Sequence, residues 1–204
     1  MAARLIEGLS ALLLVGGRSR RMGRDKASLL LDGRPCATVL CERLLTLTPS
    51  VTVLARVGQS LPDLPDGVER IDDEGAEGPL FALTQGLSAV GAPLAFVLAC
   101  DHPAFDPSFA RFLAHGFDGF VAAVPILRGR PQPLHAMYRA EAIPRLKAAL
   151  LSGERSVLRA VLGLKMLVVE EERWRAAGLC GEGLEDADDE VEWKQRTEAR
   201  ERSA

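Results

Sequence analysis

The chain has 204 residues, of which 48% are hydrophobic and 26% are charged, and its formal net charge is −3. This length fits one domain, and the apolar content excludes intrinsic disorder for most of the chain. The acidic balance argues against nucleic-acid binding through a basic surface, and no apolar run reaches the ~18 residues that a membrane helix needs.

Short continuous apolar runs recur along the chain and predict strands that are buried on both faces. In chain order they are Ala11–Val15, Val51–Ala55, Val68–Ile71, Leu94–Cys100, Phe120–Val124 and Met166–Val169. Helical segments are expected between them at Ala37–Leu47, Leu80–Ala89, Pro107–Ala114, Ala140–Leu151 and Val157–Leu162. Asp32-Gly33 predicts a tight turn. This alternation predicts an α/β fold, a three-layer α/β/α sandwich around a mostly parallel, doubly wound sheet of the Rossmann-like kind.

The end of the chain has a different composition. In Glu182–Ala204 acidic side chains outnumber basic ones, which indicates a solvated helix or a frayed tail. The cysteines also bear on the class of protein, because none of the 4 forms a CxxC pair. We therefore expect reduced thiols in a cytoplasmic protein and no structural zinc site.

The strongest functional signal follows the first predicted strand, where Gly16-Gly17 precedes the basic stretch Arg18–Lys26. Glycines at a strand end let the backbone approach a ligand closely, and consecutive N–H groups form an anion-binding concavity. Arginine and lysine neutralise phosphate. Neither GxGxxG nor GxxxxGK[ST] fits, so we interpret the stretch as a polyphosphate loop of another kind. The alternative is a glycine-rich turn followed by a solvated basic face.

A single carboxylate, Asp101, directly follows the predicted strand Leu94–Cys100. Open α/β sheets bind ligands at the carboxyl ends of their strands. Mg²⁺ needs only one or two carboxylates when phosphates supply the remaining oxygen ligands. We therefore predict that Asp101 holds Mg²⁺ beside the phosphate loop. The alternative is that Asp101 caps the turn or helix that follows.

Two further groups of residues carry weaker signals. Gly78-Pro79-Leu80 is either a ligand-contacting loop or an ordinary turn with proline at the first helical position. The 3 histidines, His102, His115 and His135, are widely spaced and lack a nucleophile context, so we expect packed or surface side chains rather than catalytic bases.

The stretch Leu13–Lys26 reads LLVGGRSRRMGRDK and resembles the pattern LxGGxSxRMGxDK of nucleotidyltransferases that make molybdenum cofactor dinucleotides. The resemblance is specifically to the molybdenum cofactor guanylyltransferases, the MobA family, and extends roughly from Leu9 to Trp193. The matching motifs continue in order at Asp32-Gly33-Arg34-Pro35, Gly78-Pro79-Leu80, Cys100-Asp101-His102-Pro103 and Gln132-Pro133-Leu134 with Tyr138.

This resemblance implies transfer of GMP from Mg-GTP onto the phosphate of molybdopterin, with release of pyrophosphate. Arg21 and Lys26 would stabilise the departing pyrophosphate, and Asp101 would hold Mg²⁺. The twin glycine resembles the guanylyl branch rather than the cytidylyl branch. The nucleotide-binding positions that it implies are Leu14, Gly16, Gly17, Ser19, Arg21, Gly23, Lys26, Asp73, Gly78, Pro79, Leu80 and Asp101.

The chain departs from the family pattern at two places. Ala55-Arg56 stands where the family often has Asn before Arg near the base. Asp186–Glu192 stands where it has Asn-x-Asn-Thr-Pro-Glu, so we expect Asp188 to be a second Mg²⁺ ligand, or else the first turn of an acid-rich helix. Position alone suggests Arg128, Arg130 and Gln132 as pterin contacts.

The expected division is a nucleotidyltransferase domain over residues 1–193 and a charged tail over residues 194–204. GTP and molybdopterin are the expected substrates, with molybdoenzymes or other cofactor-biosynthesis proteins as further partners, and neither nucleic acid nor membrane. Two alternatives stay open. One is a cytidylyl- or sugar-phosphate nucleotidyltransferase with the same loop, and the other is a catalytically idle paralogue that binds the nucleotide or cofactor.

Overall fold

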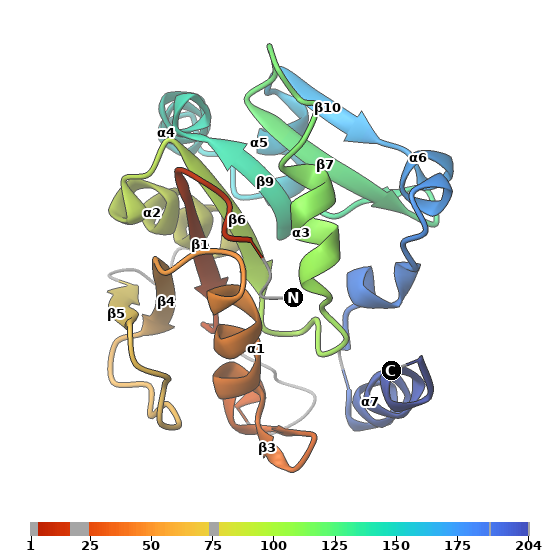
Figure 1. The fold of residues 1–204 in the computed structure, drawn as a ribbon. Helices are drawn as coiled ribbons and strands as arrows, with labels where there is room; N and C mark the ends of the chain where they lie inside the picture. The colour runs from red at the N-terminus through yellow and green to blue at the C-terminus, as the bar shows by residue number, and fades with distance from the viewer. Residues whose placement is uncertain (1–3, 17–24, 74–77, 188, 204) are drawn as a thin grey trace.

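The computed structural model describes residues 4–16, 25–73, 78–187 and 189–203 of the chain (Figure 1). One eight-stranded sheet has the order β10-β7-β9-β6-β1-β4-β5, with β8 paired to β7 beside this path. The strands are β1 (Leu9–Leu14), β4 (Val51–Arg56), β5 (Val68–Asp73), β6 (Leu94–Ala99), β7 (Ala122–Leu127), β8 (Arg130–Pro131), β9 (His135–Arg139) and β10 (Met166–Val169). The predicted α/β fold is confirmed.

Strand β1 lies in the middle of the sheet and pairs in parallel with β4 and β6. All six of its residues are buried, because helices cover both faces of the sheet and leave no solvent-facing side for polar residues. Residues 11 and 13 face one core cluster, and residues 12 and 14 face the other. These two clusters define the three layers.

The helices divide between the two faces (Figure 1). On one face lie α1 (Cys36–Leu45), α3 (Pro107–Leu113) and α6 (Glu171–Ala176), and on the other lie α2 (Pro79–Val90), α4 (Ile143–Leu151) and α5 (Val157–Leu162). Helix α2 packs closely on β1, since a Cβ at Gly86 would come within 2.5 Å of the Leu12 side chain. A larger residue than glycine would therefore push α2 away from the sheet.

The predicted bounds of β10 and α5 agree with the structure, and most other elements differ by a few residues. The strand expected at Phe120–Val124 begins at Ala122 and continues to Leu127. The segment expected from Ala140 begins as a 3-10 turn, Ala140–Ala142, before α4. The antiparallel strands β8 and β9 and helix α6 were not predicted.

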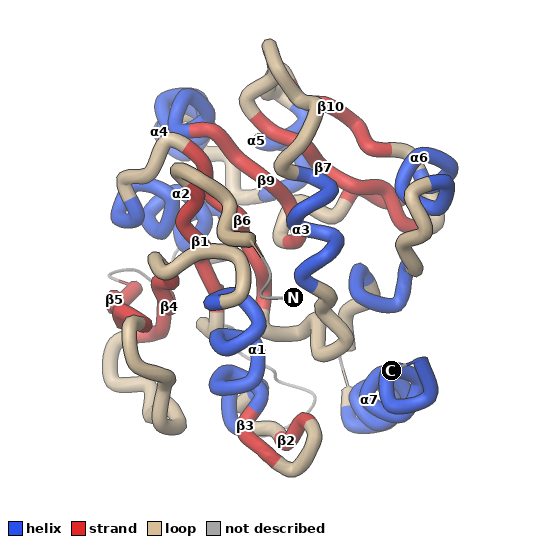
Figure 2. The backbone as a smooth tube through the Cα atoms, viewed as in Figure 1, coloured by secondary structure: helices blue, strands red, loops and turns tan. Residues whose placement is uncertain are grey.

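The predicted Asp32-Gly33 turn joins β2 (Leu30–Leu31) to β3 (Arg34–Pro35) in a separate two-stranded sheet, which lies at the lower edge of Figure 2. Asp32 and Gly33 have φ values of 54° and 73°, as a tight hairpin turn with two left-handed residues requires.

The acid-rich end forms helix α7 (Glu190–Ser203), which crosses the expected boundary at residue 193. Trp193 is only 6% exposed and belongs to the core cluster that contains the buried side of α1, whereas Val191 is 64% exposed. Within the described ranges, no helix is both long and apolar enough to cross a bilayer.

Candidate active site

Parallel pairing brings three strand ends to the same edge of the sheet. Leu14 at the end of β1 is in register with Leu54 of β4 and with Ala99 of β6. Gly16 and Asp101, two residues beyond β1 and β6, and Arg56, the last residue of β4, therefore lie at this carboxyl edge. This is the edge where open α/β sheets bind ligands.

The predicted phosphate-binding lysine and the predicted metal-binding aspartate meet at this edge. Lys26 begins the 3-10 turn η1 (Lys26–Ser28), and its Nζ lies 3.7 Å from Oδ2 of Asp101. The two side chains are 15% and 30% exposed, so solvent reaches both. A cation and a carboxylate thus lie side by side where a polyphosphate and its metal would bind.

The other carboxylate oxygen of Asp101, Oδ1, is buried and has no hydrogen-bond partner among the described residues. The Nε2 atom of His102 lies 3.6 Å from it, which is beyond hydrogen-bond distance. An orphaned carboxylate oxygen suits a hard cation such as Mg²⁺. No cluster of three or more potential metal ligands lies in the described ranges. Mg²⁺ can take its other oxygen ligands from phosphates and water as well as from carboxylates.

The C-terminal segment returns to this same strand end. The Ala187 N–H donates to the carbonyl oxygen of Asp101 at 2.9 Å. Asp188, the predicted second ligand, directly follows Ala187 but lies outside the described residues. Asp189 caps α7, because its Oδ1 accepts from the N–H groups of Val191 and Glu192 at 2.9 Å.

The predicted nucleotide-binding positions fall in three groups. Gly17, Ser19, Arg21 and Gly23 lie outside the described residues. Leu14 and Gly16 lie at the end of β1, and Asp73 ends β5. Gly78, with a φ of 94°, precedes Pro79 at the start of α2. Leu80 is fully buried, so its side chain belongs to the core and only its backbone is left to contact a ligand.

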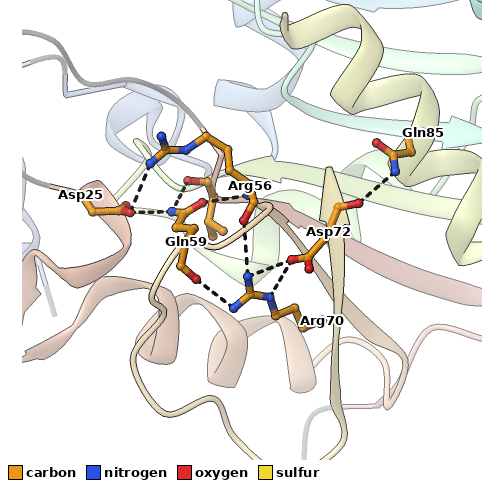
Figure 3. A network of polar contacts seen from close by, with 7 residues as sticks. Asp25, Arg56, Gln59, Arg70, Asp72 and Gln85 are labelled. Atoms are coloured by element: carbon orange, nitrogen blue, oxygen red, sulfur yellow. Dashed lines mark hydrogen bonds and ion pairs between the residues drawn. The ribbon is translucent and has the colours of Figure 1, made fainter. Parts of the chain in front are cut away.

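A polar network that the sequence analysis did not identify surrounds the end of β4 (Figure 3). It joins Asp25, just before η1, through the end of β4 to β5 and on to α2. Asp25 belongs to the motif Leu13–Lys26, but its partner Gln59 lies 34 residues away and outside every motif. The labelled residues of the network are Asp25, Arg56, Gln59, Arg70, Asp72 and Gln85.

The residues suggested as pterin contacts lie on and beside the β7–β8 hairpin, with Arg128 on its turn, Arg130 at the start of β8 and Gln132 just after β8. Arg128 has a φ of 50°, and its side chain is 72% exposed. Its guanidinium pairs with Glu185, a buried carboxylate that also pairs with Arg196 of α7. Sequence reasoning missed Glu185, since nothing local marks it among the neighbouring acids. Gln132 donates from Nε2 to the Arg130 carbonyl at 3.2 Å.

Two of the histidines are core residues, as expected. His135 is fully buried and His102 is 4% exposed, with ring centroids 5.2 Å apart, whereas His115 is exposed. Burial, and then the neighbouring His102, lowers the pKa of His135 well below 6.5, so its ring is neutral at pH 7. It packs edge-on against Phe96 and Phe109. His135 is therefore a packing residue.

All 4 cysteines are free thiols, and Cys36, Cys41 and Cys100 are buried. Burial raises the pKa of Cys41 to about 12 and that of Cys100 well above 9.0. Thiols that stay protonated are poor nucleophiles, so these residues act as core side chains.

Solved structures show the class of fold to which this site belongs. The molybdopterin-guanine dinucleotide biosynthesis protein A of Archaeoglobus fulgidus superposes with a TM-score of 0.76 at 22% identity, covering 95% of this chain and 99% of that one. The 2-C-methyl-D-erythritol 4-phosphate cytidylyltransferase of Thermus thermophilus superposes with a TM-score of 0.69 at 18% identity, covering 94% of this chain and 98% of that one. The fold is that of the nucleotidyltransferases.

Sequence comparison narrows this class to one family. The model of the MobA-like NTP transferase domain matches residues 11–166. A probable molybdenum cofactor guanylyltransferase of Chloroflexus aggregans is 33% identical over 173 residues, covering 82% of this chain and 83% of that protein. The molybdenum cofactor guanylyltransferase of Burkholderia vietnamiensis is 34% identical over 170 residues, covering 77% and 83%. The chain belongs to the MobA-like nucleotidyltransferase family, which confirms the resemblance seen in its motifs.

Proposed function

We propose that the protein transfers GMP from Mg-GTP to the phosphate of molybdopterin and releases pyrophosphate, as a step in molybdenum cofactor biosynthesis. The observation that carries this proposal is the meeting of Lys26 and Asp101 at the carboxyl edge of the sheet. The names of the curated relatives support the choice of substrates. The free cysteines favour a reducing compartment, so we place the reaction in the cytoplasm.

The reaction joins two polyanions, which repel one another, and its transition state places charge on the leaving pyrophosphate. Because the acceptor phosphate is already ionised at neutral pH, no general base is required, and positioning with charge compensation suffices. Lys26 would donate to the triphosphate, and Arg21 of the same motif would assist it. Asp73 and the start of α2 at Gly78 would contact the nucleotide.

Asp101 would hold Mg²⁺ through its buried Oδ1, and we propose Asp188 as a second ligand because Ala187 is hydrogen-bonded to the backbone of Asp101. When bound, the ion neutralises phosphate charge. The Lys26–Asp101 separation of 3.7 Å is longer than that of a close ion pair, and we propose that the ammonium group turns toward a phosphate and the carboxylate toward a cation when both bind. Arg128, Arg130 and Gln132 remain our proposed pterin contacts.

A second candidate is transfer of another nucleotide, CMP in particular. The observation that favours it is Ala55, the last buried residue of β4. Its side chain is a methyl group, whereas the family often has an asparagine amide at this position. An alanine side chain has no hydrogen-bonding group with which to read a base.

The test is to incubate the protein with Mg²⁺, molybdopterin and each nucleoside triphosphate in turn, and to identify the dinucleotide by mass spectrometry. We expect product with GTP, and we expect the Lys26→Ala variant to form it ~10²–10³-fold more slowly. Product with CTP alone would assign the second candidate. Heat stabilisation by nucleotides without any product would indicate an idle paralogue instead.

A further inference from the structure

We propose that Gln59 is a positioning residue for the nucleotide site. Its carboxamide joins the two ends of the chain segment that carries the phosphate-binding motif, and this contact sets the place of Lys26. The inference rests on the proposed function, because it assigns Gln59 a part in binding the same nucleotide. Gln59 itself lies beyond the end of β4, outside every motif that the sequence analysis singled out.

Both sides of the Gln59 carboxamide are used (Figure 3). Its Nε2 donates to the Val15 carbonyl oxygen at 3.2 Å and to Oδ2 of Asp25 at 2.6 Å. Its Oε1 accepts from the Arg56 N–H at 2.9 Å. Gln59 is 7% exposed, so these bonds are shielded from water and costly to leave unmade. Val15 directly follows β1 and Asp25 directly precedes η1, so one amide group connects both flanks of the motif.

Arg56 connects the same two flanks on the solvent side. A Cβ at Gly16 would lie 3.3 Å from Cγ of Arg56, so the arginine stem runs against the glycine backbone. The Arg56 guanidinium then approaches Oδ2 of Asp25 at 3.7 Å. Its side chain is 44% exposed, so this ion pair is weak, and the buried amide of Gln59 is the stronger tie.

The connection continues from Asp25 to Lys26. The second oxygen of Asp25, Oδ1, accepts from the Ala27 N–H at 3.0 Å and thereby caps η1. One carboxylate therefore has one oxygen on Gln59 and the other on the turn that begins with Lys26. Rotation of that carboxylate would move the turn, and with it the ammonium group that lies 3.7 Å from Asp101. The position of Lys26 thus depends on Gln59 through Asp25.

Gln59 is itself fixed by β5. The Arg70 guanidinium donates to the Gln59 carbonyl oxygen at 2.9 Å and is held in turn by Oδ1 of Asp72. The Asp72 carbonyl oxygen accepts from Nε2 of Gln85 on α2 at 3.1 Å. The network therefore spans from the motif side of the site to the helix that begins after Gly78, and it connects Gln59 to the edge strand β5.

The experiment compares four forms of the full chain by calorimetric binding of GTP with Mg²⁺ and by thermal unfolding. They are wild type, Gln59→Leu, Gln59→Glu and the double variant Gln59→Glu with Asp25→Asn. Gln59→Leu removes the bonds at nearly constant volume, so we expect the Kd for GTP to rise roughly tenfold. Gln59→Glu places two carboxylates together, so we expect a larger rise.

The double variant reverses the direction of the hydrogen bond between positions 59 and 25, because asparagine donates and glutamate accepts. Asparagine still serves as a helix cap. We expect it to bind GTP more tightly than Gln59→Glu alone, and this recovery is one that a merely structural role would not produce. Gln195→Leu is the matched control, since this glutamine is exposed and belongs to α7 rather than to the polar network around Gln59.

An unchanged Kd for GTP in Gln59→Leu would overturn the role of Gln59 while leaving the proposed function intact, whatever happens to the melting temperature. Lack of recovery in the double variant would also overturn it. A wild-type protein that binds no nucleoside triphosphate would overturn the proposed function, and the inference with it.

Discussion

On the nucleotide side of the site, a neutral amide, Gln59, holds the chain on either side of the phosphate-binding motif. On the C-terminal side, a buried carboxylate, Glu185, holds the β7–β8 turn through Arg128 and helix α7 through Arg196. We refer to these three charged residues as the C-terminal latch. The two arrangements meet near Asp101, to which Ala187 is hydrogen-bonded.

The difference between them lies in what each group must overcome when it is buried. An amide carries no net charge, so burying Gln59 with its hydrogen bonds made incurs no ionic desolvation, and its main effect is on geometry. A buried carboxylate depends on its cations, and their loss leaves an uncompensated charge. We therefore expect substitutions of Gln59 to change mainly the affinity for the nucleotide. Substitutions of Glu185 should change mainly the free energy of unfolding.

The largest effect is expected where the two sides meet. Lys26→Ala should lower nucleotidyl transfer by ~10²–10³-fold, because a charge that stabilises the leaving group is removed. The fold should be retained, since truncation of this side chain leaves no cavity in the hydrophobic core. Transfer assays and urea unfolding measure the two quantities, with the exposed Lys147→Ala as control. A loss of several kcal/mol of unfolding free energy would mark Lys26 as structural.

The next effect concerns the apolar anchor of α7. Trp193→Ala should lower the free energy of unfolding by about 3 kcal/mol, because a large buried side chain is removed. Trp193→Phe keeps most of the packing and removes only the hydrogen bond from Nε1 to the Leu30 carbonyl oxygen, 3.0 Å long, so we expect about 1 kcal/mol. Equal losses in both variants would show that the hydrogen bond, rather than packing, holds the helix.

A smaller change tests the C-terminal latch. Glu185→Gln keeps the shape of the side chain but removes its charge, and we expect the free energy of unfolding to fall by about 2 kcal/mol. Raising the salt concentration to about 1 M should narrow the gap to wild type, since Arg128 is 72% exposed and the pair is open to screening. The gap between Gln59→Leu and wild type should not respond to salt. A salt-independent Glu185 effect would remove the contrast between the two sides.

The last prediction concerns the pH dependence of the free energy of unfolding, which we assign to His135, a residue of neither Gln59's network nor the C-terminal latch. Burial lowers the pKa of His135 well below 6.5, so the unfolded chain takes up a proton near that pH while the folded chain does not. Its contribution to stability is complete above pH ~6.5 and falls by about 1.4 kcal/mol per pH unit below it. His135→Phe, in a site lined by Phe96 and Phe109, should flatten this slope in urea unfolding at several pH values. The exposed His115→Gln variant should retain it.

The regular elements were predictable because their signals are local. An unbroken apolar run such as Leu94–Cys100 identifies a buried strand, and Asp32-Gly33 identifies the tight turn between β2 and β3. Strand β9 was not predicted, because it has only five residues and carries the polar side chains of His135 and Arg139 at its ends. Its antiparallel pairing with β6 and β7 depends on the sheet, not on its own pattern.

The candidate site divides in the same way. Asp101 and Lys26 were identified from motifs at strand ends, and the structure brings them together. Gln59 and Glu185 were not identified, because their partners Asp25 and Arg128 are 34 and 57 residues away in the chain. A polar residue that acts through a distant partner has no spacing by which to recognise it, and only the tertiary structure reveals the pairing.

The contact between Trp193 and Leu30 joins positions that are 163 residues apart, and this has a consequence for protein synthesis. The ribosome delivers the N-terminal part of a chain first, and early segments begin to fold while later ones are still being made. Strands β1, β4, β5 and β6 are complete by Ala99, so the central sheet leaves the ribosome well before α7 is translated. Docking of Trp193 on Leu30 can therefore occur only after these four strands have been synthesised, and until then the Leu30 carbonyl oxygen lacks the indole N–H from which it accepts in the folded chain.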